Sequence, residues 1–164
     1  MDIKDNLKVG FGYDSHKFSK KRKLFLCGIE IKGEDGLEGY SDADACLHSI
    51  IDALLSTTNL GDIGENFPSE DEKYKDISSV ILLNETMEKI KKNYKNFEII
   101  NLNLTILAEK PKISPLKDKL KENLSKLLKI EKEKISISAK TQDKMGFIGR
   151  GEGMASICIC LVKI

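Results

Sequence analysis

Both histidines of the chain lie near aspartates at spacings that suit a metal site. Asp14 and His16 are two residues apart in an apolar run typical of a strand, so both side chains project to the same side. His48 lies in a segment with helical spacing, with Asp44 and Asp52 one turn before and after it. Two imidazoles and one carboxylate are a three-ligand set that leaves zinc an open fourth position, the pattern of catalytic sites. The alternative is that each histidine is a core residue without a ligand.

A glycine-rich loop, Lys140–Gly153, is the second candidate site. Its four glycines allow backbone N–H groups to approach an anion. It also contains Asp143, a possible ligand for a hard cation, and Arg150, one of only two arginines in the chain with Arg22. The loop lacks the Walker A pattern. An ordinary glycine-rich loop would have the same composition.

Two further polar segments can bind parts of a ligand. Asn59–Asp71 combines glycines with acidic and hydroxyl side chains that suit a hard cation or a polyol. Ala108–Ser114 is a kinked basic turn whose lysines can meet phosphate. Either segment alone is also typical of a surface loop. Together the four regions favour a phosphoryl-transfer enzyme, in which metals and donors neutralise developing charge, but they name no substrate.

The elements that must position these residues indicate an α+β fold. Leu7–Tyr13 and Leu24–Ile31, joined by Ser19–Lys23, predict a β-hairpin, and Ser41 is predicted to cap a helix with Asp44 as its capping-box acid. The other predicted elements are helices over Ser78–Asn93 and Ser114–Leu128 and strands over Ile100–Ile106, Lys134–Lys140 and Met154–Val162. This order predicts a mixed or antiparallel sheet covered by helices. Because both faces of Met154–Val162 are apolar or small, that strand is central or packs on a neighbouring subunit.

Composition narrows the class of protein. The 164 residues predict a single domain, 1–164, and 27 basic against 26 acidic side chains give a net charge of +1. This balance favours neither nucleic acid nor a membrane surface as partner. No apolar run approaches the roughly 20 residues of a membrane span, and the start, Met1–Lys8, is polar. We expect a cytoplasmic protein, or an organellar one of plastid type if a presequence was removed. The four cysteines are expected to be buried and reduced.

Five blocks of the sequence, in order, resemble one known family. They are Gly-Tyr-Asp-Ser-His, Ser-Asp-Ala-Asp-Ala-Cys-Leu-His-Ser-Ile-Ile-Asp-Ala-Leu-Leu, Gly-Asp-Ile-Gly-x-x-Phe-Pro, Ala-x-x-Pro-Lys and Gly-Phe-x-Gly-Arg-Gly-Glu-Gly. The chain from Val9 to Val162 thereby resembles the 2-C-methyl-D-erythritol 2,4-cyclodiphosphate synthases of the non-mevalonate isoprenoid pathway. Any one block would be unspecific, whereas five in the family's order and spacing are highly specific.

The resemblance implies a homotrimer of subunits, each with helices on one face of its sheet, and active sites at the subunit interfaces. The implied reaction is intramolecular, which makes the enzyme a phosphorus-oxygen lyase. The 2-phosphate of 4-diphosphocytidyl-2-C-methyl-D-erythritol 2-phosphate attacks the β-phosphate, forming the cyclic diphosphate and releasing CMP. No protein nucleophile is needed, in agreement with a chain that offers no Ser–His or Cys–His pair.

The family's functional residues can be carried over by position. The resemblance implies Zn²⁺ on Asp14, His16 and His48, with Mg²⁺ or Mn²⁺ on Asp143. Thr141 and Tyr40 take the catalytic, transition-state positions. Asp52 would bind ribose, and the erythritol part would meet Asp62, Ile63, Gly64, Phe67, Pro68, Ser69, Glu70 and Asp71. The remaining implied substrate contacts are Ser41, Ala108, Glu109, Lys110, Pro111, Lys112, Ile113, Ser114, Ala139, Lys140 and Gln142. Phe147 and Arg150 would lie toward the trimer axis, where family members can hold an isoprenoid diphosphate.

Three positions depart from the family's pattern. Tyr40 replaces a frequent histidine, and its hydroxyl donates a hydrogen bond without a positive charge. Asp143 replaces a longer glutamate, and Lys140 replaces a small hydroxyl residue. Two rival functions stay open at this point: a zinc-dependent phosphohydrolase with Asp44 or Asp52 as general base, and a trimeric ligand-binding module without turnover.

Overall fold

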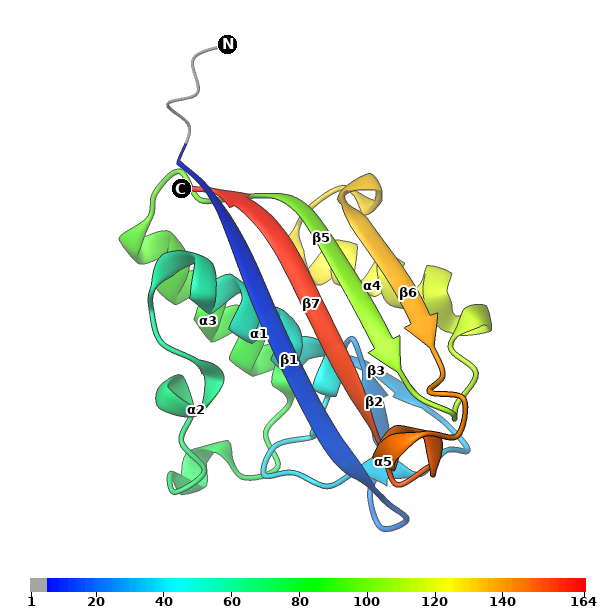
Figure 1. Cartoon of the computed structure of the whole chain (residues 1–164). Coiled ribbons are helices and arrows are strands. Elements are labelled where there is room, and N and C mark those ends of the chain that lie inside the picture. The colour runs from blue at the N-terminus through cyan, green and yellow to red at the C-terminus, as the bar shows by residue number, and fades with distance from the viewer. Residues whose placement is uncertain (1–5) are drawn as a thin grey trace.

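A five-stranded mixed sheet forms one layer of the protein, in the order β4-β1-β7-β5-β6 (Figure 1). The computed structural model describes residues 6–164, so residues 1–5 of the polar start lie outside the described residues. The strands are β1 (Leu7–Ser19), β4 (Gly36–Leu37), β5 (Glu98–Leu107), β6 (Ile135–Lys140) and β7 (Gly153–Lys163). β5 and β6 are parallel and the other pairs are antiparallel. The strand predicted over Met154–Val162 is β7, which lies in the centre of the sheet. This is one of the two positions that its apolar faces predicted.

The predicted hairpin between the first two apolar runs is wrong. Residues Leu7–Lys17 of β1 pair with β7, almost 150 residues later in the chain, and the last two residues of β1 pair with β4. The second run folds on itself instead, as β2 (Leu24–Leu26) and β3 (Ile29–Ile31), around Cys27 and Gly28, both with positive φ. A tight turn therefore lies inside the segment that was expected to be one strand.

Three long helices cover one face of the sheet: α1 (Ala45–Thr58), α3 (Ser79–Asn93) and α4 (Lys117–Leu128) (Figure 1). α3 has Ser78 as its N-cap, so it begins within one residue of the predicted start and ends at the predicted Asn93. α1 is capped by Asp44 rather than Ser41, because Asp44 accepts from the Leu47 N–H at 3.0 Å. Ser114 does not cap α4, which follows the 3-10 turn η2 (Ser114–Leu116).

Short helices interrupt the loops that the sequence predicted. The segment Asn59–Asp71, expected to be a loop, contains α2 (Ile63–Asn66), and η1 (Glu72–Tyr74) follows it. The glycine-rich loop contains α5 (Gly146–Gly149), and η3 (Lys132–Lys134) precedes β6. Among residues 6–164, every helix is too short or too polar to span a membrane.

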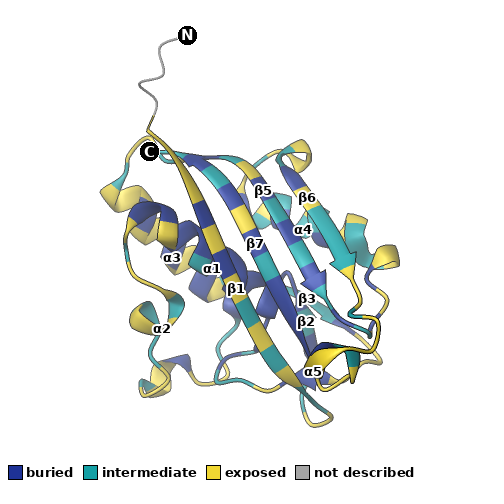
Figure 2. Ribbon diagram, in the orientation of Figure 1, coloured by how far each residue is buried: buried dark blue, intermediate teal, exposed yellow. Residues whose placement is uncertain are grey.

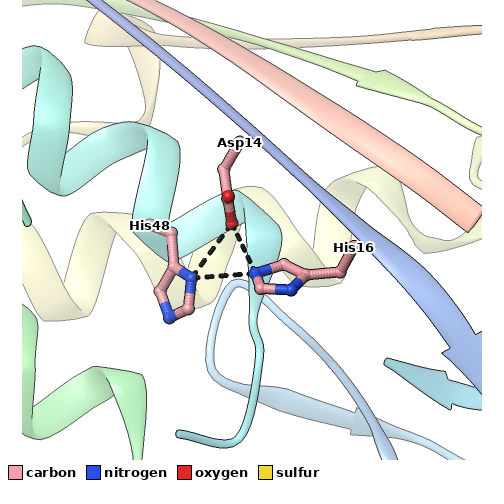
Figure 3. Close-up of side chains that lie close together, drawn as sticks. All are labelled: Asp14, His16 and His48. Carbon is pink, nitrogen blue, oxygen red and sulfur yellow. Dashed lines mark hydrogen bonds and ion pairs between the residues drawn. The ribbon is translucent and has the colours of Figure 1, made fainter. Parts of the chain in front are cut away.

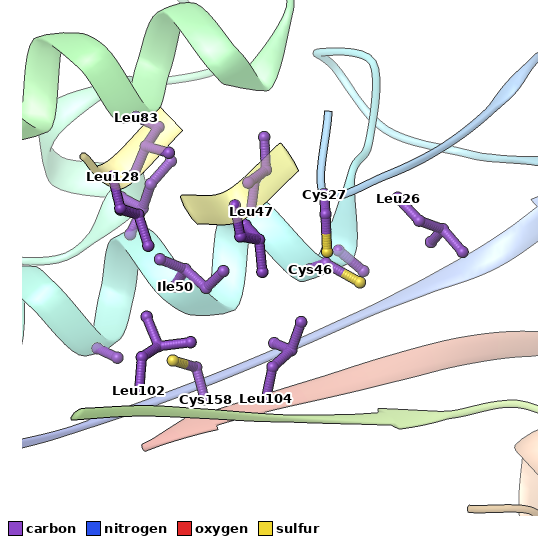
Figure 4. Close-up of a cluster of buried hydrophobic side chains, with 14 of the residues drawn as sticks. Leu26, Cys27, Cys46, Leu47, Ile50, Leu83, Leu102, Leu104, Leu128 and Cys158 are labelled. Carbon is purple, nitrogen blue, oxygen red and sulfur yellow. The ribbon is translucent and has the colours of Figure 1, made fainter. Parts of the chain in front are cut away.

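The core lies between the sheet and the helices (Figure 4). Leu47 and Ile50 of α1 point toward Leu102 and Leu104 of β5, and all four side chains are fully buried. The four cysteines, all within the described residues, are buried and free, as predicted. This apolar layer fixes the position of α1 above the sheet.

Two glycines in β1 allow α1 to lie unusually close to that strand. A Cβ atom on Gly12 would meet the Ser49 carbonyl oxygen at 1.9 Å, and one on Gly10 would meet the Ala53 carbonyl oxygen at 2.0 Å. Real side chains cannot tolerate such distances, so only glycine permits this helix-strand contact. The contact brings His48 of α1 over the strand that carries Asp14 and His16.

The other face of the sheet carries exposed apolar side chains, four on β1 and one on β7, and Figure 2 shows the exposed positions. Val9 and Phe11 are 70% and 58% exposed, and Leu7, Tyr13 and Ile159 are also exposed. Phe11 and Ile159 are register partners on the two strands. A contiguous apolar patch of this kind indicates an interaction surface. We call Leu7, Val9, Phe11, Tyr13 and Ile159 the outer sheet patch.

Candidate metal centre

Asp14 and His16 of β1 meet His48 of α1 in one cluster (Figure 3). The Asp14 Oδ2 atom lies 2.8 Å from His16 Nε2 and 3.0 Å from His48 Nδ1, and the two nitrogens are 3.2 Å apart. Ligand atoms in a tetrahedral zinc site with bonds of about 2.0 Å are separated by roughly 3.3 Å. The three donors therefore have the types and the spacing that a zinc ion requires. The sequence-based prediction that these residues come together is confirmed.

Each histidine uses its other ring nitrogen to contact the protein. His16 Nδ1 donates to the Glu38 carbonyl oxygen at 2.6 Å, so in the neutral ring the Nε2 lone pair would face a cation bound in the cluster. With Nδ1 facing the cluster, His48 Nε2 donates to Ser79 Oγ at 2.9 Å and Ser41 Oγ at 3.1 Å. Such partners orient metal-binding imidazoles and select the tautomer. Both rings are thus held ready to coordinate.

The electrostatics of the cluster favour an ionised carboxylate. Burial would raise the pKa of Asp14, but hydrogen bonds from His16 and His48 and their charges hold that pKa well below its ordinary value. Burial would lower the pKa of His16, and the bond to Asp14 outweighs it, so the pKa is raised. A cation in this cluster would find a carboxylate already charged.

The cluster opens into a cavity of about 230 Å³. Its lining residues are Asp14, His16, Tyr40, Ser41, His48, Ile63, Gly64, Phe67, Tyr74 and Leu82. Eight of these were predicted as site residues. Tyr74 and Leu82 were missed, because an aromatic or leucine side chain carries no chemical signal in the sequence.

Three other predicted residues surround this cavity through hydrogen bonds. Asp52 Oδ1 accepts from the Ile63 N–H at 2.8 Å, and Asp62 caps α2. The Tyr40 hydroxyl donates to the Asp71 carbonyl oxygen at 3.4 Å. Burial raises the pKa of Asp52, and the Ile63 N–H opposes this shift. Pro68, Ser69 and Glu70 lie in the same loop between α2 and η1.

A second group of predicted residues gathers at the ends of β5 and β6. The Ala108 N–H donates to the Lys140 carbonyl oxygen at 3.0 Å, and the Gln142 N–H donates to Glu109 Oε1 at 2.8 Å. Residues 108–109 therefore lie beside residues 140–142. Thr141 and Asp143 are exposed in the loop that follows β6.

Phe147 and Arg150, the two residues expected near the trimer axis, each line a cleft. Glu109, Lys110 and Arg150 line a cleft of about 840 Å³. Phe147 and His16 line a separate one of about 410 Å³. Arg150 is paired with Glu152, at 2.6 Å between Nε and Oε1.

The two groups are separated by strands within one chain. Asp14 pairs with Ser156, Ser156 with Ile106 and Ile106 with Ala139, so all four occupy one row across the sheet. Three strand spacings of about 4.8 Å place Ala139 roughly 14 Å from Asp14. Ser156 and Ile106 are fully buried between them.

Asp44, one of two candidates for a general base, instead holds the backbone in place through hydrogen bonds. Its carboxylate accepts from the N–H groups of Gly28 at 2.6 Å, Cys27 at 3.1 Å and Leu47 at 3.0 Å, and the residue is fully buried. Burial, with the Asp42 charge adding to it, raises the pKa of Asp44 to about 6 despite the Gly28 N–H. Because Asp44 does not line the cavity, it is not placed to activate a water molecule there.

An α+β fold with a carboxylate and two imidazoles at an open cavity defines the class of proteins that carry a candidate metal site beside a pocket of small-molecule size. Within that class, the chain belongs to the YgbB family, whose model matches residues 7–163. The resemblance found in the five sequence blocks is thereby confirmed.

Named relatives share both sequence and fold with this chain. The 2-C-methyl-D-erythritol 2,4-cyclodiphosphate synthase of Brachyspira hyodysenteriae is 52% identical over 157 residues, 96% of this chain and 98% of that protein. The bifunctional IspDF structure from Campylobacter jejuni has a TM-score of 0.89 at 37% identity, over 96% of this chain and 42% of that longer one. IspF from Plasmodium falciparum, in complex with CDP, has a TM-score of 0.82 at 31% identity over 96% of each chain.

Proposed function

We propose that this protein converts 4-diphosphocytidyl-2-C-methyl-D-erythritol 2-phosphate to 2-C-methyl-D-erythritol 2,4-cyclodiphosphate and CMP, as a phosphorus-oxygen lyase of the non-mevalonate isoprenoid pathway. The observation that carries the proposal is the cluster of Asp14, His16 and His48 at the mouth of a cavity. The synthase name of the Brachyspira hyodysenteriae relative and the CDP complex of the Plasmodium falciparum neighbour support the substrate class.

The proposed cofactors are Zn²⁺ and Mg²⁺ or Mn²⁺. Asp14, His16 and His48 fit Zn²⁺ by donor type and spacing. Asp143 offers one exposed carboxylate, which suits Mg²⁺ when substrate phosphates supply other ligands. When bound, the two ions would neutralise phosphate charge and polarise the β-phosphorus.

The protein's own residues fold and hold the substrate. Because nucleophile and electrophile belong to one molecule, correct folding of the substrate removes most of the entropic cost of reaction. The cavity at Ile63, Gly64 and Phe67 would hold the erythritol part, and Asp52 the ribose. The Thr141 hydroxyl and the Tyr40 hydroxyl would donate hydrogen bonds to the phosphates as charge develops.

We further propose a homotrimer in which each active site combines two chains. The metal centre and the proposed cytidine diphosphate segments, 108–114 and 139–142, are separated by buried parts of the sheet. This separation supports a site in which the metal centre of one copy faces the second group of a neighbouring copy. The exposed outer sheet patch offers an apolar surface for such assembly. Head-to-tail contacts of this kind close into rings.

The axis of this trimer is the proposed site of a second ligand, an isoprenoid diphosphate. Phe147 and Arg150 are both exposed near the end of β1, where an apolar tail and a diphosphate would find partners. Arg150, which now pairs with Glu152, would bind the anion either in place of Glu152 or together with it.

Phosphorus NMR of the reaction tests the proposed function. The purified chain, supplied with Zn²⁺ and Mg²⁺, is incubated with the cytidine diphosphate substrate. The cyclic diphosphate and CMP should appear together in equal amounts. Release of inorganic phosphate would instead support a phosphohydrolase, and an unchanged spectrum would support a binding module without turnover.

A further inference from the structure

Arg22 contacts the segment that orients both histidines of the metal centre. Its NH1 group donates to the Gly39 carbonyl oxygen at 2.7 Å, and its NH2 group donates to the Ser41 carbonyl oxygen. We call residues 38–42 the strap. We propose that Arg22 is a positioning residue that holds the strap in the conformation required for metal binding. This inference rests on the proposed function, because it assumes a metal at the centre.

The strap contacts each histidine on the side away from the metal. The Glu38 carbonyl oxygen accepts from His16 Nδ1 at 2.6 Å, and Ser41 Oγ accepts from His48 Nε2 at 3.1 Å. Tyr40, between the two carbonyl groups that Arg22 binds, lines the cavity. A displaced strap would therefore free the His16 ring, remove one of the two hydrogen bonds that orient the His48 ring, and move one wall of the site.

The strap depends on contacts from outside itself, because it lies in neither a helix nor a strand. Its backbone is held by the Asp76 N–H, which donates to the Tyr40 carbonyl oxygen at 2.7 Å, and by the Ile77 carbonyl oxygen, which accepts from Asp42 N–H at 2.9 Å. Arg22 satisfies the carbonyl groups of Gly39 and Ser41 on either side of Tyr40. Backbone carbonyl groups in such segments need donors of this kind.

The geometry requires arginine rather than any cation. One guanidinium reaches two carbonyl oxygens at once, which a single ammonium cannot do in the same arrangement. The side chain is only 28% exposed. Its ion pair with Asp76, at 3.5 Å to a carboxylate that is 68% exposed, is too open to contribute much. The two carbonyl contacts are therefore the important ones, in a chain whose other basic residues, apart from Arg150, are lysines.

Substitution with measurement of Zn²⁺ affinity tests this role. Arg22→Lys keeps the charge but loses the fork, and we expect Zn²⁺ affinity to fall about tenfold or more in competition with a chelator. The absorption spectrum of the Co²⁺-loaded variant should also change, because ligand geometry changes. Lys21→Ala is the matched control, since it removes one charge from an exposed position in the same turn. Asp76→Asn removes only the ion pair, and both controls should bind Zn²⁺ like the wild type.

The outcomes separate this inference from the proposed function. If the wild-type chain binds no Zn²⁺, the proposed metal centre itself fails. If the wild type binds Zn²⁺ and folded Arg22→Lys binds it equally well, with an unchanged Co²⁺ spectrum, only the role of Arg22 is overturned. If Arg22→Lys does not fold, Arg22→Gln decides in the same assay. Failure of both variants to fold would contradict a positioning role and make Arg22 a residue of general stability.

Discussion

His16 and His48 each use one ring nitrogen for the cluster and the other for the protein, so neither is available as a free acid or base. We predict that His48→Ala abolishes turnover and lowers bound zinc by removing one of three ligands, while assembly persists because the outer sheet patch is untouched. Elemental analysis of the purified variant measures the zinc. Full zinc occupancy would contradict the assignment of His48 as a ligand.

Tyr40 lines the cavity, and its hydroxyl has only a long contact, 3.4 Å, to the Asp71 carbonyl oxygen. The hydroxyl is therefore free to turn toward substrate. Tyr40→Phe should lower kcat with little change in KM if the hydroxyl assists the transition state. Tyr94→Phe is the control, because it also removes a tyrosine hydroxyl, but one that bonds the Thr58 carbonyl oxygen and does not line the cavity. Its kcat should stay unchanged. An unchanged kcat in Tyr40→Phe would make Tyr40 a packing residue.

The sequence was sufficient to predict the candidate metal ligands but not the groups that orient them. Alternation in a strand places Asp14 and His16 on one side, and helical spacing places His48 near two aspartates, but only the family resemblance implied that Asp14, His16 and His48 form one ligand set. Ser79 and the Glu38 carbonyl oxygen reach the rings through tertiary contacts. No local pattern marks a backbone carbonyl group or one serine among two at a helix start. Arg22 was distinguished only by being an arginine among lysines.

At the scale of elements, the close contact between α1 and β1 sets the distance between His48 and the other two ligands. Gly12→Ala should lower the free energy of unfolding by about 1–3 kcal/mol, since its Cβ meets the Ser49 carbonyl oxygen and α1 must shift. Zn²⁺ affinity should fall as well. Gly10→Ala clashes with the same helix one turn farther from His48, so it should cost similar stability with a smaller loss of affinity. Urea unfolding and chelator competition measure the two effects. Equal Zn²⁺ affinity in Gly12→Ala and the wild type would show that the contact between α1 and β1 does not set the position of His48.

The errors in the predicted elements have local causes. The hairpin was inferred from neighbouring apolar runs, whereas the partner of β1 is the distant strand β7. Asp44 and Ser41 are both good capping residues. Only the fold shows that Ala43 has a φ of 58°, which is not helical, so the helix cannot begin directly after Ser41. Sequence patterns specified that a helix begins near these residues, but not which oxygen accepts the Leu47 N–H.

For the whole molecule, an α+β fold with a mixed sheet was predictable from the order of helices and strands. The assembly was implied only by family resemblance, because one chain's pattern does not distinguish a solvent-facing strand from an interface.

Phe11→Glu places a charge in the outer sheet patch, and we predict a shift from trimer to monomer with loss of turnover. Sedimentation analysis measures the shift, and Lys8→Glu on the neighbouring exposed position is the control. A stable trimer of Phe11→Glu would show that the outer sheet patch is not the interface.

The central claim is that one active site uses the metal centre of one chain and the Thr141 loop of another. Co-expression of His48→Ala and Thr141→Ala chains, each inactive or nearly so alone, tests it most directly through product formation by phosphorus NMR. In a randomly mixed head-to-tail trimer, about a quarter of the sites combine an intact metal centre with an intact Thr141, so turnover should return to about that fraction of wild type. Mixed trimers with no more activity than either variant alone would contradict the claim.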